Sequence, residues 1–110
     1  MKKFLIILFC LFICACSNSK SDKIAQVMSE NDYIIIDVRT KEEYEQLHVV
    51  DALNIPYDDI DENINIDKDT VILVYCQSGN RSHMAYNVLT NLGYTVYDMG
   101  GINDVNLPKE

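Results

Sequence analysis

The chain has 110 residues, a formal net charge of −8 and 48% hydrophobic residues, which is enough material for one domain. The hydrophobic fraction argues against general disorder, and the acidic balance argues against a nucleic-acid partner. Four cysteines in so short a chain would fit a two-disulfide scaffold, but three of them lie in the first 16 residues and only Cys76 follows. This spacing excludes a domain held together by two internal disulfides.

The N-terminal segment has the layout of a secretory signal peptide. Lys2 and Lys3 provide the positive start, and residues 4–16 are thirteen apolar residues without a charge. A helix that spans the hydrocarbon core needs about 20 apolar residues, so a permanent transmembrane anchor is the weaker interpretation. A polar stretch follows directly at residues 17–22. The segment is therefore predicted to direct export rather than to form part of the fold.

The end of the apolar run resembles the lipobox of bacterial lipoproteins. Ile13 stands three residues before Cys16, and the small residue Ala15 stands directly before it. The resemblance implies that residues 1–15 are removed, that Cys16 carries lipid such as palmitate, and that residues 16–21 form a short tether. The implied location is the bacterial cell envelope, outside the cytoplasm and anchored by lipid. Cleavage by an ordinary signal peptidase, with the cysteines as apolar filler, is the alternative.

Residues 22–110 are predicted to form the single folded domain. Continuous apolar runs indicate strands buried on both faces, and N-cap residues and glycines mark the ends of helices. In chain order, the predicted elements are a helix capped by Ser21 or Asp22, a strand at 33–37, a capping-box helix from Thr40 to about His48, a brief strand at 52–55, a helical turn at 58–63, a strand at 70–75, a helix from Ser82 to Gly93 and a strand at 94–99.

This alternation predicts an α/β fold with a mostly parallel sheet of four or five strands and helices on both faces. Strands separated by helices favour right-handed crossovers, which place the helices over the sheet. In open parallel sheets, ligands bind beyond the carboxyl ends of the strands. Cys76 lies at such a place, directly after the strand at 70–75 and at the start of a polar loop that contains glycine.

Cys76 is the candidate reactive group of this loop. Backbone amides of residues 77–82, the N-terminus of the next helix and the charge of Arg81 would favour a thiolate, with a pKa below the usual ~8.5. The same groups would hold an anion attached to the sulfur. A lone cysteine is more often a small buried hydrophobic residue. Gly79 three residues later and Arg81 five residues later are hard to explain by packing alone.

The loop Cys76–Ser82, CQSGNRS, resembles the active-site loop of the rhodanese domain. Three further segments are similar to motifs of that family in the same order: DVRTKEEY at 37–44, HVVDALNIP at 48–56 and GYTVYDMGG at 93–101. The resemblance covers residues 22–107 and implies a rhodanese-like three-layer fold. Several motifs in the right order are a stronger signal than any one of them alone.

The rhodanese family consists of sulfurtransferases, so the resemblance implies a ping-pong reaction through a persulfide on Cys76. The donor would be a small sulfur anion of the thiosulfate type, and the acceptor a thiol, a cyanide-like ion or a protein. Arg81 would bind the donor or stabilise charge on the leaving group. No metal or organic cofactor is implied, and the protein is expected to act as a monomer. The other substrate-binding residues implied are Gln77, Ser78, Gly79, Asn80 and Ser82.

Three other functions stay open. A persulfide carrier or sulfide-binding module would use the same residues to deliver sulfur to a protein partner, and a noncatalytic domain would keep only the fold. Cysteine-dependent phosphatases and arsenate reductases also place an arginine after the cysteine. They are disfavoured because they have five residues between the two, whereas four separate Cys76 from Arg81.

Supporting roles are predicted for residues near the strand at 33–37. Asp37 and Arg39 lie at the same edge of the sheet as the loop, so they are expected to support it through an ion pair or a hydrogen-bond network. Arg39 is expected to pair with Glu43. His48 is expected to bond to the backbone at a helix end rather than to act as an acid or base. Asp51 stands where the family has glycine, and it is expected to adopt left-handed turn geometry.

Overall fold

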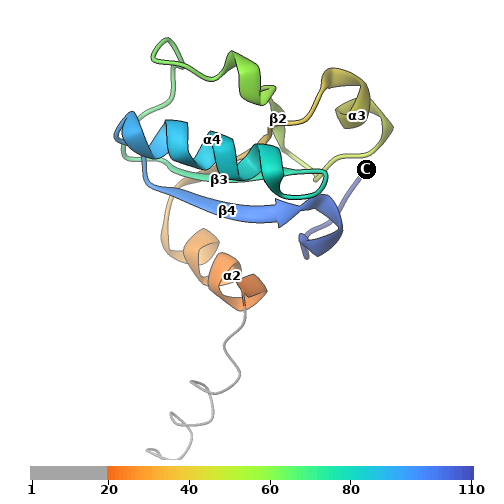
Figure 1. Cartoon of the computed structure of the whole chain (residues 1–110). Helices are drawn as coiled ribbons and strands as arrows, with labels where there is room; N and C mark the ends of the chain where they lie inside the picture. Colours follow the sequence, from red (N-terminus) through yellow and green to blue (C-terminus); the bar gives the residue numbers. More distant parts are fainter. Residues whose placement is uncertain (1–19) are drawn as a thin grey trace, which may run out of the picture.

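The structure is a computed structural model that describes residues 20–110 (Figure 1). The signal peptide predicted for residues 1–15, the lipidated Cys16 and the tether as far as residue 19 lie outside the described residues, so they stay predictions. Within the described part, no helix is both long enough and apolar enough to cross a membrane.

A four-stranded sheet forms the middle layer, and all of its strand pairs are parallel. The strand order is β2-β1-β3-β4, so β1 and β3 are central and their carboxyl ends lie side by side. β3 is buried at every position. The predicted α/β fold is therefore confirmed, with four strands. Their bounds are β1 (Tyr33–Asp37), β2 (Leu53–Asn54), β3 (Val71–Cys76) and β4 (Val96–Gly101).

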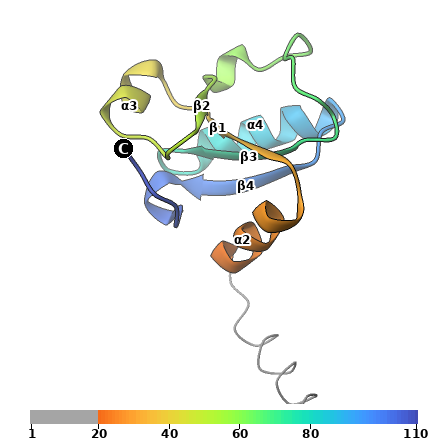
Figure 2. The same ribbon diagram turned by 180° about the vertical axis from the view of Figure 1, so that it is seen from behind.

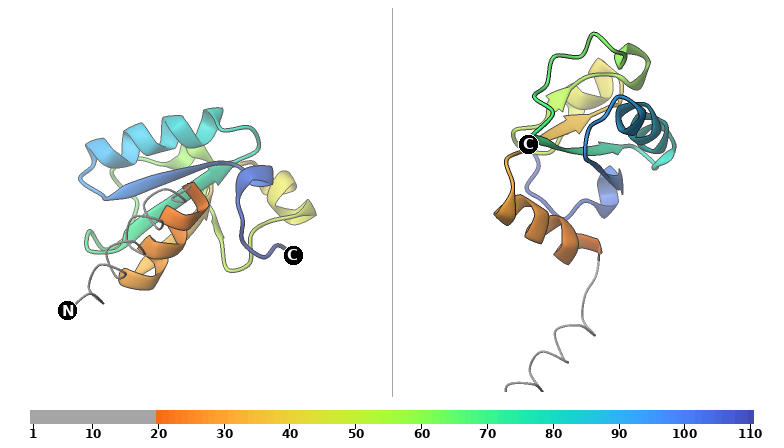
Figure 3. Two further views of the ribbon diagram at one scale, coloured as in Figure 1. Left: turned by 90° about the horizontal axis from the view of Figure 1, so that it is seen from below. Right: turned by 90° about the vertical axis from the view of Figure 1, so that its left-hand side faces the viewer.

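Helices cover both faces of the sheet, as Figure 2 and the two views of Figure 3 show. Helix α4 (Asn80–Asn91) and the 3-10 turn η1 (Tyr57–Asp59) pack on one face. Helix α2 (Lys20–Glu30) and the 3-10 turn η2 (Ile102–Asp104) pack on the other. The short helix α3 (Lys41–Gln46) follows β1 and lies at the carboxyl edge of the sheet (Figure 1). The predicted three layers are present.

Helix α4 begins two residues earlier than the predicted start at Ser82. Gly79 precedes the helix with φ of 104°, a left-handed conformation that glycine adopts without a steric cost. This turn sends the chain directly from the loop into α4 at Asn80. The Ser82 hydroxyl donates to the Gly79 carbonyl over 3.1 Å instead of capping the helix. Asn80, Arg81 and Ser82 therefore belong to the first turn of α4.

Helix α3 ends at Gln46 rather than near His48. Its start is as predicted, with the complete capping box between Thr40 and Glu43. The chain then becomes extended at Leu47, because the following residues pair with the C-terminal segment. The His48 N–H donates to the Glu110 carbonyl over 3.0 Å, and the Glu110 N–H donates to the His48 carbonyl over 2.8 Å. Pairing between distant segments thus overrides the local helical pattern.

The remaining boundaries differ by smaller amounts. Helix α2 begins at Lys20, ahead of the predicted caps, and the helical turn predicted at 58–63 is the three-residue η1. That turn is short because the Asn63 N–H donates to the Asp61 carboxylate, which starts a separate turn. The last strand runs from Val96 to Gly101 instead of 94–99, so it begins and ends two residues later than predicted. Asp51 has φ of 70°, which confirms the predicted left-handed conformation.

Alternating side chains of the central strands divide the core between the two faces. Ile35 and Leu73 pack with α2, whereas Ile36, Ile72 and Val74 pack with α4. Both sets are almost completely buried. The strands are apolar on both sides because each face supports its own helix.

We expect Leu89→Ala to lower the free energy of unfolding by about 3 kcal/mol, because Leu89 is fully buried between α4 and the sheet. Urea denaturation followed by circular dichroism measures this change. The matched control is Val88→Ala, which removes an exposed side chain from the same helix and should change stability by less than about 0.5 kcal/mol. Equal losses in the two variants would contradict this packing.

Candidate active site

Cys76 is the last residue of β3, and its side chain is completely buried. The Gly79 N–H donates to Sγ over 2.9 Å, and the thiol lies 3.5 Å from the Ser82 hydroxyl oxygen. Helix α4 begins only four residues after Cys76, so its first turn faces the sulfur. The strand, the glycine turn and the helix together form a cradle around Sγ, which we define as residues 76–82.

This cradle favours the ionised form of Cys76. Burial raises the pKa of the thiol, but the hydrogen bond with the Ser82 side chain and those from the N–H groups of Ser82, Gly79 and Ser78 outweigh it and lower the pKa below its ordinary value. These donors stabilise a thiolate at the N-terminal end of a helix, where the helix dipole also favours negative charge. The side chains of Ser78 and Asn80 are exposed at the rim of the cradle.

The end of β4 lies directly beneath the cradle. Gly101 is the partner of Cys76 in the sheet. A Cβ atom at residue 101 would lie 2.7 Å from the Gln77 carbonyl oxygen, which is closer than real side chains approach backbone. Glycine is therefore required at this position for the loop to rest on the sheet.

Asp37 and Arg39 reach the cradle through a buried network. Arg39 Nη2 lies 2.7 Å from Asp37 Oδ2, and the two side chains are 4% and 0% exposed. Arg39 Nη1 donates to Gln77 Oε1 over 2.9 Å, so the Gln77 side chain is held by Arg39 and contributes no donor to the sulfur. Arg39 also donates to the Leu47 carbonyl after α3. The network joins β1, α3 and the cradle.

Tyr75 is a member of this network that the sequence analysis missed. Its hydroxyl donates to Asp37 Oδ2 over 2.7 Å and accepts from the Val49 N–H over 2.9 Å. Burial raises the pKa of Tyr75 well above its ordinary value, so the phenol stays protonated. In the sequence, Tyr75 was only one more large residue of an apolar strand. Only its position beside Cys76, at the end of that strand, could have indicated a role in the site.

Arg81 forms an ion pair with Glu43, so the predicted pair of Arg39 with Glu43 is wrong. Arg81 Nη1 lies 2.8 Å from Glu43 Oε1, and Nη2 lies 3.1 Å from Oε2. Arg39 is instead turned inward to Asp37, while the first turn of α4 brings Arg81 to the start of α3. Hydrogen bonding from Arg81 lowers the pKa of Glu43 to about 2. Glu43 is thus ionised at all physiological pH values.

Neither histidine side chain has a recorded hydrogen bond to the cradle. His48 Nδ1 lies 2.8 Å from the Tyr44 carbonyl oxygen, and its ring stacks on that of Tyr44, so it is bonded to backbone as predicted. His83 is exposed and lies 4.0 Å from Asp98. Among residues 20–110, no three histidine, cysteine or acidic side chains cluster in a way that could hold a metal ion.

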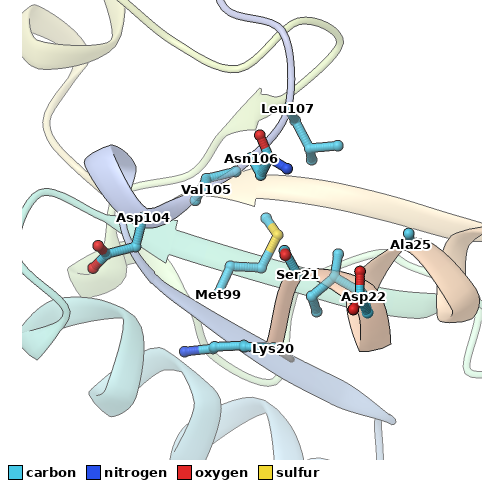
Figure 4. A pocket seen from close by; sticks show the side chains of 10 residues that line it. Lys20, Ser21, Asp22, Ala25, Met99, Asp104, Val105, Asn106 and Leu107 are labelled. Carbon is cyan, nitrogen blue, oxygen red and sulfur yellow. The ribbon is translucent and has the colours of Figure 1, made fainter. Parts of the chain in front are cut away.

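A small cavity of about 130 Å³ lies on the other face of the sheet (Figure 4). Side chains of α2, of β4 and of the segment after β4 surround it, including Ala25, Met99 and Leu107. Cys76 packs with the residues on the α4 face. This cavity is therefore separate from the cradle.

Comparison with known proteins agrees with this geometry. The family model described as Rhodanese-like domain matches residues 20–107, so the chain belongs to the rhodanese family. It is 42% identical over 78 residues to thiosulfate sulfurtransferase PspE of Escherichia coli strain K12, covering 67% of this chain and 75% of that protein. A solved structure of a rhodanese with anions from E. coli superposes with a TM-score of 0.67 at 39% identity, covering 71% of this chain and 96% of that one.

A third relative has a different description. YrkF of Bacillus subtilis, whose name describes a sulfur carrier protein, is 33% identical over 70 residues. The match covers 63% of this chain but only 38% of YrkF. The similarity to PspE and to the E. coli rhodanese structure identifies the chain as a rhodanese-type sulfurtransferase.

We expect Ser82→Ala to move the pH dependence of Cys76 alkylation to higher pH. When Cys76 ionises, the Ser82 hydroxyl 3.5 Å away can turn from the Gly79 carbonyl and donate to Sγ. Loss of the hydroxyl removes this bond, worth about 1 kcal/mol, so alkylation by iodoacetamide at pH 7 should slow about fivefold. The control is Ser78→Ala, which keeps the backbone N–H and changes only an exposed hydroxyl. If both variants titrate like the wild type, Ser82 does not stabilise the thiolate.

Proposed function

We propose that this protein transfers sulfane sulfur through a persulfide on Cys76. The observation that supports this most directly is the buried Sγ with the Gly79 N–H at 2.9 Å, within a cradle that lowers the pKa of the thiol. The thiolate, not the thiol, is the nucleophilic form of cysteine. Only four residues separate Cys76 from Arg81, and so short a loop suits one additional sulfur atom better than a tetrahedral oxyanion.

The first half-reaction uses thiosulfate or a related donor. The Cys76 thiolate attacks the outer sulfur of the donor, a new S–S bond forms, and the bond between that sulfur and the sulfonate sulfur breaks. The electron pair of the broken bond leaves with sulfite. Because sulfite is a stable anion, its departure needs no general acid. N–H groups of the cradle would stabilise the negative terminal sulfur of the persulfide, as an oxyanion hole stabilises oxygen.

The second half-reaction returns the enzyme to its starting state. A thiophilic acceptor such as cyanide attacks the outer sulfur, thiocyanate forms, and the electron pair of the S–S bond returns to Cys76 as thiolate. Arg81 would assist the first step by binding the anionic donor, since a guanidinium has five N–H groups and only two of them are used on Glu43. The two steps balance without a metal or an organic cofactor.

Cys76→Ser should lower the steady-state transfer of sulfur from thiosulfate to cyanide by at least about a hundredfold, because the nucleophile of both half-reactions is lost. Thiocyanate formation measures the rate. The intact mass of the wild type, but not of the variant, should rise by one sulfur atom after incubation with thiosulfate. Unchanged turnover in the variant would exclude the persulfide mechanism.

The same measurement separates an enzyme from a carrier, the second function that the similarity to YrkF favours. A carrier would form the persulfide once and release it slowly to cyanide, so thiocyanate would appear as a single burst equal to the protein concentration. Continuous turnover supports the enzyme.

We also propose that the protein is a lipoprotein of the bacterial cell envelope, anchored through Cys16. The support is the signal-peptide layout and the lipobox-like residues before Cys16. Since α2 begins at Lys20, four peptide steps of at most about 14 Å would separate the lipid from the domain. Removal of residues 1–15 takes away Lys2 and Lys3 and changes the formal net charge from −8 to −10. So acidic a protein would not be attracted to anionic headgroups, and the lipid itself would have to provide the attachment.

Cys16→Ser should move the protein from the membrane fraction to the soluble fraction of a bacterial expression host, because the acylated sulfur is lost. Immunoblotting of the two fractions measures the change. The control is Cys10→Ser, which alters a cysteine of the predicted signal peptide but leaves the lipobox-like residues intact. Identical fractionation of the wild type and Cys16→Ser would exclude the lipid anchor.

A further inference from the structure

The charge at the mouth of the cradle is balanced by the protein itself. Glu43 and Arg81 form a bidentate pair at 2.8 and 3.1 Å, with side chains 30% and 27% exposed. The other guanidinium that contacts the cradle, Arg39, is paired with buried Asp37. Two cations and two anions thus sum to zero. An approaching anion therefore meets no guanidinium whose charge is uncompensated.

A cavity of about 350 Å³ lies beside the cradle, with Glu43 and Gln77 in its wall. This volume is roughly ten times the 30 Å³ that a water molecule occupies in the liquid, so it is larger than thiosulfate requires. Its wall also includes two apolar side chains, the exposed Leu47 and the buried Ile102. An organic group carried by the donor could contact both.

The compensated charge of Arg81 and the size of the cavity both disfavour a small dianion as the donor. Attraction between unit charges scales with their product, so a dianion loses twice as much as a monoanion when Arg81 is neutralised. A monoanion with an organic substituent loses less and gains apolar contact in the cavity. The capping box places Glu43 at this point, because the same carboxylate oxygen accepts from the Thr40 N–H and from Arg81.

We propose that Glu43 is a specificity-determining residue of this site, which makes it favour monoanionic organic donors of sulfane sulfur, of the thiosulfonate class, over the thiosulfate dianion. The proposal rests on the proposed persulfide function. With such a donor, the Cys76 thiolate attacks the terminal sulfur of R–SO₂–S⁻ and forms the persulfide. The bond to the sulfonyl sulfur breaks, and its electron pair leaves with the sulfinate R–SO₂⁻.

The test compares thiosulfate with methanethiosulfonate, which carries one negative charge less and replaces one oxygen by methyl. Sulfur transfer from each donor to cyanide is measured with the full chain, as the wild type and as Glu43→Gln. Glutamine keeps an oxygen acceptor for the capping box but removes the charge. The variant should raise kcat/KM for thiosulfate about fivefold and that for methanethiosulfonate at most about twofold. Raised salt should reduce the gain.

The matched control is Glu42→Gln, which removes the same charge from the exposed neighbouring position of α3. It should leave the ratio of the kcat/KM values for thiosulfate and methanethiosulfonate unchanged. In a second variant, Glu43→Gln is combined with Arg81→Gln, so that both charges of the pair are absent and their sum is zero, as in the wild type. The ratio of kcat/KM for thiosulfate to kcat/KM for methanethiosulfonate should then return toward that of the wild type. These results together would assign the effect to the charge of Glu43 on Arg81.

A donor ratio that is the same in Glu43→Gln and the wild type, while Cys76 still forms a persulfide, would overturn the role of Glu43 and leave the proposed function intact. An equal shift in Glu42→Gln would also overturn it, because the effect would then be one of overall charge. Absence of a persulfide in the wild type with either donor would overturn the proposed function and this inference with it.

Discussion

At the carboxyl end of β1, the guanidinium of Arg39 and the carboxylate of Asp37 share a site that is almost closed to water. An ion pair in such a place is stable only when its remaining donors and acceptors are also bonded. The bonds run to Tyr75, Gln77 and the Leu47 carbonyl, and so they connect three segments of the chain to one charged centre. Satisfying this one pair thus positions the loop that carries Cys76.

The second ion pair, Glu43 with Arg81, has a different environment and therefore a different role. It is partly open to solvent, where an ion pair contributes little to stability. What it changes is the electrostatic potential at the mouth of the cradle. The buried pair holds the reactive loop in place, and the partly exposed pair adjusts which anions approach it. Both pairs connect the end of β1 or the start of α3 to the region of Cys76.

Local patterns were sufficient to predict most of the fold and the position of the reactive cysteine. The strand before Cys76 is a continuous apolar run, and the capping box of Thr40 and Glu43 is a contiguous motif. The errors came from long-range contacts. The partner of Glu43 is 38 residues away, and the sequence offered Arg39 at a shorter separation. The end of α3 depends on pairing with Glu110, and the Tyr75 hydroxyl finds its donor at Val49, 26 residues away.

The backbone of Gly101 contacts the backbone of the cradle at Gln77 and Ser78. Because Gly101 has no side chain, the Gln77 carbonyl can pack directly against the backbone of β4, and Sγ is buried. A methyl group there would lift the loop and leave the sulfur nearer to solvent. The depth of the sulfur is therefore set by the backbone of a neighbouring strand, not by the loop's own side chains. Reagents and substrates therefore reach Cys76 only as far as the packing of its loop on β4 allows.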